Sequence, residues 1–344
     1  MDRSQNDPRC RKGEVLTAEL LAPPDTSEES ADGRFIDGLF ARLMATAALT
    51  VIAVLVATAV FLLIRAWPAL SHYGPLSFFH ARWAPSEAVA TLSKPNPYGI
   101  LQFIYGTVVT SLVAMAITVP VAIAVALYIT NLSPAVLRRP LSSLVDLLAA
   151  IPSVVYGFWG VFALIPALGP IGRGLTSVSG IPVIGWLFQG PFFGYSVFAA
   201  GVVLAIMVLP IVTAICREVF DTAPATEKEA ALAVGATKWE MLRIAVLPRS
   251  RSGIIGAAIL GLGRAFGETI AVTMLIGNNV LTIPHGIMRA GSTMPSVIAN
   301  EFTEANQPFH LDALFVVAFG LLLLSLVVNM VGKRIVGRVS DHIA

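Results

Sequence analysis

Six long apolar runs, separated by polar connections, dominate the pattern of hydrophobic and polar positions along the chain. The hydrocarbon core of a bilayer is about 30 Å thick, and a helix needs roughly 20 apolar residues to cross it. Each run has about that length, so the pattern predicts an all-α integral membrane protein with six transmembrane helices. The expected spans are 39–64, 103–130, 142–166, 194–216, 253–277 and 311–332.

Composition excludes two other classes of protein. Of the 344 residues, 56% are hydrophobic and only 13% are charged, whereas a soluble domain carries about 25% charged residues. The mean hydropathy is +0.78. A net charge of +2, without a basic patch that interleaves aromatic residues, gives no reason to expect nucleic-acid binding. The two cysteines, Cys10 and Cys216, are expected on the cytosolic side, so neither a disulfide nor a metal site is predicted.

The ends of the chain and its first span are organised differently from the rest. Residues 1–38 form a polar tail that mixes charges, Ser and Pro without periodicity, which predicts a largely disordered segment. The run that follows is too long for a signal peptide and lacks a small-residue cleavage site. The expected regions are therefore this tail, the first span with an outer loop over 39–102, a core of five spans over 103–336, and a C-terminal tail over 337–344.

The distribution of Lys and Arg predicts the orientation, because basic loops are retained in the cytosol. Basic residues are concentrated in the N-terminal tail, after the second and fourth spans, and beyond the sixth. If both termini lie inside, all of these are cytosolic. The outer loops then hold only Arg65, Arg82, Lys94, Arg173 and Arg289. We therefore expect a multi-pass protein of the cell membrane with cytosolic N- and C-termini.

The connection after the fourth span is charged and amphipathic, with the sequence TEKEAALAVGATKWEMLRIAVLP over 226–248. Thr226 with Glu229, and Thr237 with Glu240, each fit a capping box at the start of a helix. Gly235 lies between them, where glycine allows a left-handed residue at a helix end. The pattern predicts two short helices joined by a glycine turn.

Pro248 is expected to end the second of these helices. Ala230, Ala231 and Ala233 give the first helix a small-residue face that another protein can approach closely. From these residues alone, an amphipathic linker at the membrane surface is an equally good interpretation of the segment.

This segment resembles the EAA loop of ABC-importer permeases, in which EAA is followed by three residues, a glycine, nine residues and I-x-L-P. The residues that match are Glu229, Ala230, Ala231, Gly235, Leu247 and Pro248, while Ala245 stands where the family usually has Ile. In that family the loop forms coupling helices that dock onto a cytosolic ATPase. The resemblance therefore implies an ATP-driven transporter.

Further stretches resemble the PstC family, the phosphate-specific permease subunits of ABC importers. They are GLGRAFGETIAVTMLIGN at 261–278, LLAAIPSVVYGFWG at 147–160 and IANEFTEA at 298–305. The resemblance implies transport of inorganic phosphate across a bacterial inner membrane. It also implies a PstA-like second permease subunit, a PstB-like cytosolic ATPase dimer and an extracytoplasmic PstS-like phosphate-binding protein. Membrane lipid is the remaining partner.

Three ionisable residues, Asp146, Arg264 and Glu268, fall inside predicted spans, where an unpaired charge costs about 2.5–3.5 kcal/mol. They should therefore face the protein interior. Arg264 and Glu268 are four residues apart and could pair on one helix face, as a clamp that only holds helices together. Alternatively, the fork of donors on Arg264 binds a translocating oxyanion, and a carboxylate accepts a hydrogen bond from protonated phosphate. Thr269 is a further candidate for this substrate path.

The sequence contains no cofactor or metal motif. No H-E-x-x-H is present, and the five histidines are scattered. The chain also lacks G-x-x-x-x-G-K-[ST], so ATP is expected to be bound by partner subunits and the chain itself is not expected to be an enzyme. The alternatives are a permease for sulfate or molybdate, an ion-coupled secondary carrier that uses Asp146 and Glu268 as proton sites, and, more remotely, an intramembrane hydrolase.

Overall fold

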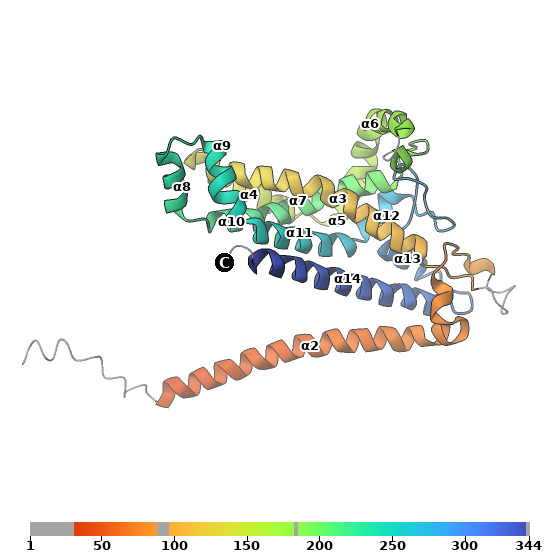
Figure 1. Ribbon diagram of the computed structural model, residues 1–344. Coiled ribbons are helices and arrows are strands. Elements are labelled where there is room, and N and C mark those ends of the chain that lie inside the picture. Colours follow the sequence, from red (N-terminus) through yellow and green to blue (C-terminus); the bar gives the residue numbers. More distant parts are fainter. Residues whose placement is uncertain (1–30, 88–95, 182–184, 342–344) are drawn as a thin grey trace, which may run out of the picture. The chain divides into compact units, whose positions relative to one another are not determined.

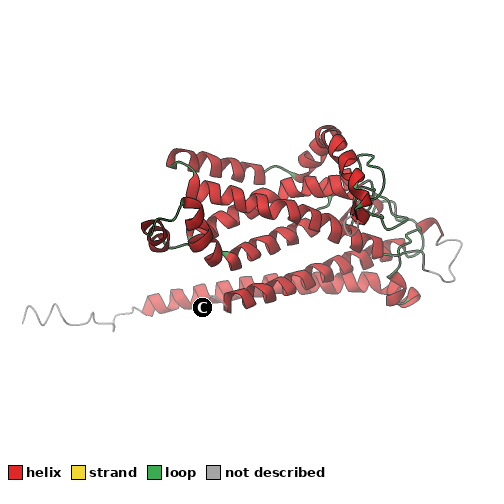
Figure 2. Cartoon of the chain, turned by 45° about the horizontal axis from the view of Figure 1, so that its top comes forward, coloured by secondary structure: helices red, strands yellow, loops and turns green. Residues whose placement is uncertain are grey.

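The computed structural model describes residues 31–87, 96–181 and 185–341, and all regular structure in these ranges is helical (Figures 1 and 2). The only β pairing among them is two isolated bridges, Trp83 with Tyr98 and Gly277 with Gly291. The all-α prediction is therefore confirmed. Most of the predicted tail, including Cys10, lies outside the described residues.

The chain divides into two compact units, Met1–Thr58 and Ala59–Ala344. Helix α2 (Ala31–Tyr73) crosses the boundary between them. In the first unit the described residues form only the start of this helix, and the apolar side chains from Leu39 to Ala57 are exposed. Helix α2 begins at Ala31, so residues 31–38, which the sequence assigned to a disordered tail, are helical.

The second unit contains the remaining helices. In chain order they are α3 (Leu101–Leu127), α4 (Ala135–Ala149), α5 (Ser153–Trp159), α6 (Ile165–Ser177), α7 (Val197–Asp221), α8 (Ala225–Ala233), α9 (Lys238–Met241), α10 (Leu247–Arg249), α11 (Arg251–Phe266), α12 (Ile270–Ile276), α13 (Met294–Glu301) and α14 (His310–Asp341). The predicted C-terminal tail from residue 337 is thus helical as far as Asp341.

Five helical stretches of the described chain are long and apolar enough to cross a membrane: Asp37–Tyr73, Leu101–Leu132, Ser153–Ser177, Val197–Asp221 and His310–Arg338. A sixth candidate is the pair Lys238–Arg249 and Arg251–Phe266, which is bent by 70°. The first, second, fourth and sixth predicted spans overlap these stretches closely.

The third span differs from its prediction of 142–166. The chain first forms the separate helix α4, and the apolar stretch begins only at Ser153. Pro152 is the N-cap of α5, and a proline disfavours the helical conformation of the residue before it. The helix therefore breaks at this point, and the span begins 11 residues later than predicted, at Ser153 and not at residue 142.

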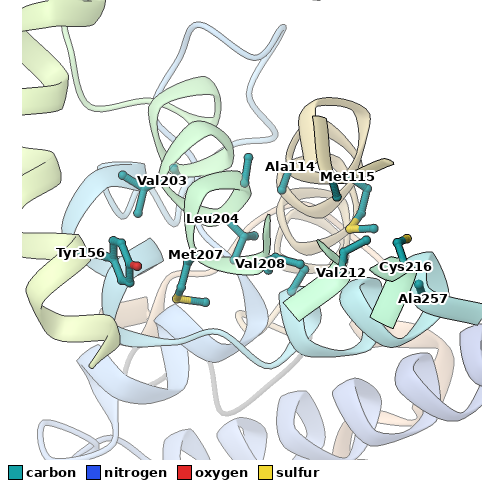
Figure 3. Close-up of a cluster of buried hydrophobic side chains, with 14 of the residues drawn as sticks. Ala114, Met115, Tyr156, Val203, Leu204, Met207, Val208, Val212, Cys216 and Ala257 are labelled. Atoms are coloured by element: carbon teal, nitrogen blue, oxygen red, sulfur yellow. The ribbon is translucent and has the colours of Figure 1, made fainter. Parts of the chain in front are cut away.

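Helix α7 lies at the centre of the packed core (Figure 3). Its buried side chains contact α3, α5 and α11; the cluster includes Ala114, Met115, Tyr156, Val203, Leu204, Val208, Val212 and Ala257. Small residues let these helices pack closely. This is common in membrane proteins, because lipid is as apolar as the side chains and helix association depends on close packing. A Cβ added to Gly261 would lie 2.6 Å from a methyl carbon of Val212. Gly261 therefore allows α11 to pack closely against α7.

A second buried cluster joins the end of α2 to α13, the start of α14 and the loop before α3. It consists largely of aromatic and aliphatic side chains, among them Tyr73, Phe78, Trp83, Tyr98, Phe103, Val297 and Leu314. Trp83 and Tyr98 are fully buried, and their rings pack edge to face at 5.3 Å. This cluster anchors the loop that follows the first span.

Three helices of the described chain widen into π-helical segments, Tyr128–Leu132, Gly160–Leu164 and Leu242–Val246. Each segment is centred four residues before a proline; the prolines are Pro134, Pro166 and Pro248. Inside a helix, a proline cannot donate a hydrogen bond to the carbonyl four residues before it, and its ring crowds that carbonyl. At Pro166 and Pro248 the helix continues through the proline and the wider turn relieves the crowding, whereas the segment before Pro134 ends its helix at Ser133, which is extended.

Candidate functional site

The fifth predicted span, 253–277, is interrupted at its most polar point. Helix α11 ends at Phe266 and α12 begins at Ile270. The N–H of Glu268 donates to the carbonyl of Ala265 at 3.4 Å, and the Thr269 hydroxyl donates to the carbonyl of Gly267 at 3.3 Å. These local bonds compete with continuation of the helix. The continuous helix predicted through Arg264 and Glu268 is therefore wrong.

Arg264 and Glu268 are not joined to each other in the described part of the chain. Neither side chain has an ion pair or hydrogen bond to another described residue. Arg264 is exposed, while Glu268 and Thr269 are half-buried. The three residues thus gather at one helix break, but the Arg264–Glu268 clamp does not form among the described residues.

The position of Arg264 along α11 places its charge deep in the span. It lies 13 residues after Arg251, the first residue of α11, which corresponds to roughly 20 Å at 1.5 Å per residue. An arginine at that depth facing lipid would cost about 2.5–3.5 kcal/mol. The surface that carries Arg264 is therefore suited to a water-filled path or to a second protein, and not to lipid.

Asp146 lies apart from this break. It belongs to α4, before the third apolar stretch, and its carboxylate accepts a hydrogen bond from Arg217 of α7 at 2.9 Å. The Asp146 side chain is 58% exposed and that of Arg217 is 16% exposed. The prediction that Asp146 lies inside the third span is wrong: it belongs to α4, which it ties to the end of α7.

The segment that resembles the EAA loop forms two short helices around a glycine turn (Figure 1). Helix α8 ends in a Schellman motif, in which Ala236 N–H donates to Ala231 and Gly235 N–H donates to Leu232. Gly235 has a φ of +90°, a left-handed conformation that suits glycine. The predicted glycine turn is confirmed.

Only one of the two predicted capping boxes is present. Thr237 and Glu240 form the reciprocal pair at the start of α9. Thr226 does not cap α8, because Pro224 is the N-cap and the helix already begins at Ala225. The second helix also runs further than predicted: after the π-helical segment it continues through Pro248 to Arg249, and the chain bends at Ser250.

The EAA residues divide between two surfaces. Ala231 and Leu247 pack against the core, whereas Glu229, Ala230 and Gly235 are exposed. Four large apolar side chains of this loop are also exposed: Leu232, Val234, Trp239 and Ile244. Arg249 pairs with Glu227 at 2.8 Å and holds α10 to α8. The loop is thus fixed from inside and presents an apolar outer surface; we call residues 225–249 the coupling loop.

Two features of the structure have little local signal in the sequence. Arg217 pairs with Asp146, which lies 71 positions away along the chain. Glu301, within the IANEFTEA stretch, accepts hydrogen bonds from Trp83 and His310, and Trp83 is 218 positions away. No local pattern reports such long-range contacts. A carboxylate at the end of a short, largely apolar helix is the one local signal available.

Comparison with known proteins defines the class of the chain. Residues 118–341 match the family described as binding-protein-dependent transport system inner membrane component. The chain is therefore a multi-pass membrane permease of a binding-protein-dependent transport system. A solved structure of the MetNI methionine ABC transporter in an inward-facing conformation is 19% identical, with a TM-score of 0.49, and the match covers 70% of this chain and 95% of that one.

Two relatives define the family within this class. A protein of Xylella fastidiosa (strain 9a5c) called phosphate transport system permease protein PstC is 40% identical over 326 residues, which cover 93% of this chain and 97% of that protein. The protein of the same name from Mycobacterium leprae (strain TN) is 42% identical over 286 residues, covering 81% and 86%. The chain belongs to the PstC family.

Proposed function

We propose that this chain is a membrane subunit of an ATP-driven importer of inorganic phosphate, and that it carries the substrate path and hydrolyses no ATP itself. The relatives called phosphate transport system permease protein support the substrate. The observation that carries the mechanism is that one chain combines a coupling loop with an exposed apolar surface and an arginine that lies deep in a span and has no ion pair with any described residue.

The coupling loop is the docking surface for a cytosolic ATPase dimer of the PstB type. Leu232, Val234 and Trp239 are exposed on helices that are themselves anchored to the core, so a partner that covers them can move α11 through α10. ATP binds to that partner, because the chain has no phosphate-binding glycine loop. No cofactor of this chain's own is required.

The substrate path runs past the break between α11 and α12. Arg264 offers a planar fork of N–H donors to the phosphate oxygens. Glu268 accepts a hydrogen bond from a protonated oxygen of phosphate, which sulfate lacks near neutral pH. Thr269 already donates to Gly267, so its contribution is to hold the break open and not to contact substrate. Arg264 has no ion pair or side-chain hydrogen bond to any residue that the structure describes, which leaves its charge for the anion.

The remaining partners follow from the surfaces that this chain leaves uncovered. The face carrying Arg264 requires a second permease subunit, of the PstA type, to enclose the path. A PstS-type binding protein delivers phosphate on the side opposite the coupling loop. We propose that both termini and the coupling loop are cytosolic, as the distribution of basic residues favours.

Reconstitution of the chain with its ATPase, second permease and binding protein in liposomes tests this function. We expect uptake of labelled phosphate that requires ATP and the binding protein. Neither sulfate nor molybdate should compete with this uptake. Competition by sulfate would move the assignment to a general oxyanion permease. Uptake driven by a pH gradient through the chain alone would show a secondary carrier and overturn the proposal.

A further inference from the structure

A cavity of about 750 Å³ opens at the end of α12 that is remote from Glu268. Three segments line it: residues 191–195 before α7, the last turns of α12, and residues 277–290. All of these residues lie in the second unit, on the side of that unit opposite the coupling loop (Figure 1). We call this cavity the outer vestibule.

Backbone hydrogen bonds fix the walls of the outer vestibule. Val197 N–H donates to the carbonyl of Arg289 at 3.0 Å, which ties the loop to the start of α7. Gly291 N–H donates to the carbonyl of Ile276 at 3.0 Å and closes the loop onto α12. Gly277, at a φ of +89°, and Asn278, at +50°, turn the chain sharply between these bonds. Main-chain hydrogen bonds therefore frame the cavity.

The side chains that line the outer vestibule supply hydrogen-bond donors and a positive charge. Arg289 is exposed and has no ion pair with any described residue. Its side chain lies across Gly190, where an added Cβ would be 2.6 Å from Nε, so the glycine makes room for the arginine. Among the lining residues, all of which are described, there is no aspartate or glutamate.

Two neutral side chains add to this donor set. The Oδ1 of Asn279 accepts a hydrogen bond from Leu281 N–H at 3.0 Å, which fixes the orientation of the amide and leaves its NH₂ group without a partner in the described chain. The hydroxyl of Thr282 likewise has no described partner and lines the cavity. Asn278 is different, because its NH₂ group already donates to Thr273.

We propose that the outer vestibule is a low-affinity binding site for an oxyanion, which in the importer proposed above is inorganic phosphate. The donors and the positive charge of Arg289 attract an anion, and no carboxylate lines the cavity to repel it. The openness of the cavity keeps the anion hydrated, which suits brief occupancy. The inference rests on the proposed function only for the identity of the anion.

The position of the outer vestibule gives it a place in transport. Helix α12 has seven residues and so spans roughly 10 Å, with the vestibule at one end and Glu268 just before the other. Phosphate released into the vestibule is thus one short helix away from the break that carries Arg264 and Glu268. The vestibule raises the local concentration of phosphate at the entrance of the path.

Cysteine labelling in the assembled importer, without binding protein or ATP, tests the site directly. Thr282→Cys reports the cavity and Leu76→Cys, at an exposed position outside it, serves as reference, both in a chain with Cys10 replaced by Ser. We expect an anionic thiol reagent to label Thr282→Cys roughly tenfold faster than a cationic reagent, relative to the reference, as for a focused positive cleft. Millimolar phosphate should slow this labelling, while chloride at equal ionic strength should not.

Substitutions at arginine distinguish the site from general surface charge. Arg289→Gln should remove both the preference for the anionic reagent and the protection by phosphate, and Arg289→Lys should retain the preference. Arg173→Gln, at an exposed arginine that does not line the cavity, is the matched control and should change neither. If chloride and phosphate at equal ionic strength protected equally, the effect would be screening of the charge by salt and not binding of phosphate, and the proposal would be overturned. ATP-driven uptake that persists in that case would leave the proposed function standing.

Discussion

His310, at the start of α14, and Glu301, at the end of α13, form a largely buried pair, with Nε2 of His310 2.8 Å from Oε2 of Glu301. The same carboxylate oxygen accepts a hydrogen bond from the indole N–H of Trp83 at 2.7 Å. The Tyr98 ring stacks on His310, and its hydroxyl donates to the carbonyl of Pro308. Burial, with nearby Tyr73, Glu301 and Asp312, raises the pKa of Tyr98 well above its ordinary value, so this hydroxyl remains a donor.

Removal of the Glu301 carboxylate should destabilise this region measurably. Glu301→Ala leaves the Trp83 indole and the His310 ring without their acceptor, at a cost of about 1–3 kcal/mol for each buried group. We expect a lower melting temperature of the purified chain and faster proteolysis of the loop before α3. Glu301→Gln should be milder because it keeps one acceptor oxygen. Glu304→Ala, at an exposed glutamate just beyond α13, is the control, and an equal effect there would contradict the prediction.

Gly235 should be required for coupling and not for membrane insertion. Its φ of +90° costs any residue with a Cβ about 1–2 kcal/mol, so Gly235→Ala, and more strongly Gly235→Val, should distort the turn between α8 and α9. Glu229→Lys should impair the same surface by reversing an exposed charge. Assembled complexes should hydrolyse ATP with little phosphate uptake. Gly174→Ala, at a glycine with open space around it, should transport normally. Normal uptake by all Gly235 and Glu229 variants would exclude the docking role.

The start of α9 should loosen in acid. Hydrogen bonds from the backbone and hydroxyl of Thr237 lower the pKa of Glu240 below its ordinary value of 4.5. The stabilisation is therefore present above pH 4.5, and it is lost as pH falls through the lower, folded-state pKa. Hydrogen exchange at residues 238–241, corrected for intrinsic rates, should show this step. Glu240→Gln accepts hydrogen bonds without ionising and should abolish the step; its persistence there would assign it to another group.

The charges at the helix break should matter for transport and not for assembly. Arg264→Gln combined with Glu268→Gln replaces two charges by amides of similar size, which a purely structural clamp would tolerate. We expect the double variant to co-purify with its partners and to transport poorly, because an amide does not replace the guanidinium. Arg264→Lys should also be impaired, since a point charge lacks the bidentate fork. Near wild-type uptake by the assembled double variant would defeat the site and restore the clamp interpretation.

Orientation can be measured with two exposed positions. A cysteine at Leu281, near the outer vestibule, should react with a membrane-impermeant thiol reagent added to intact cells. A cysteine at Val234, on the coupling loop, should react only after the membrane is permeabilised. The native Cys216 is buried and should stay unlabelled in both cases. Labelling of Val234→Cys from outside would reverse the proposed topology.

Hydrophobic length and turn chemistry determined what could be predicted from sequence. The apolar runs predicted the helical class, and the glycine and the Thr237–Glu240 pair predicted the turn in the coupling loop, because these signals act over a few residues. The third span was misplaced because Leu144, Leu147 and Leu148 extend the apolar run backwards into the separate helix α4. Hydropathy alone does not register the break that Pro152 imposes between them.

The candidate site was predictable in identity and not in geometry. Arg264 and Glu268 stand out as charges within an apolar run, but their spacing of four residues suggested a helical pair that the break at Gly267 removes. The partner of Asp146 was also unpredictable, because Arg217 lies on a different helix. Such contacts depend on how the helices are packed, and no local pattern encodes them.

The wide turns before Pro166 and Pro248 have a consequence for how this chain can change during evolution. A π-helical turn holds one more residue than an α-helical turn, so each is equivalent to a single-residue insertion that the proline accommodates. Loss of the proline together with one residue of the turn would restore an ordinary helix and keep the same side chains facing the core on both sides. Homologues should therefore carry one-residue gaps at these places together with replacement of the proline, while the surrounding helices stay in register.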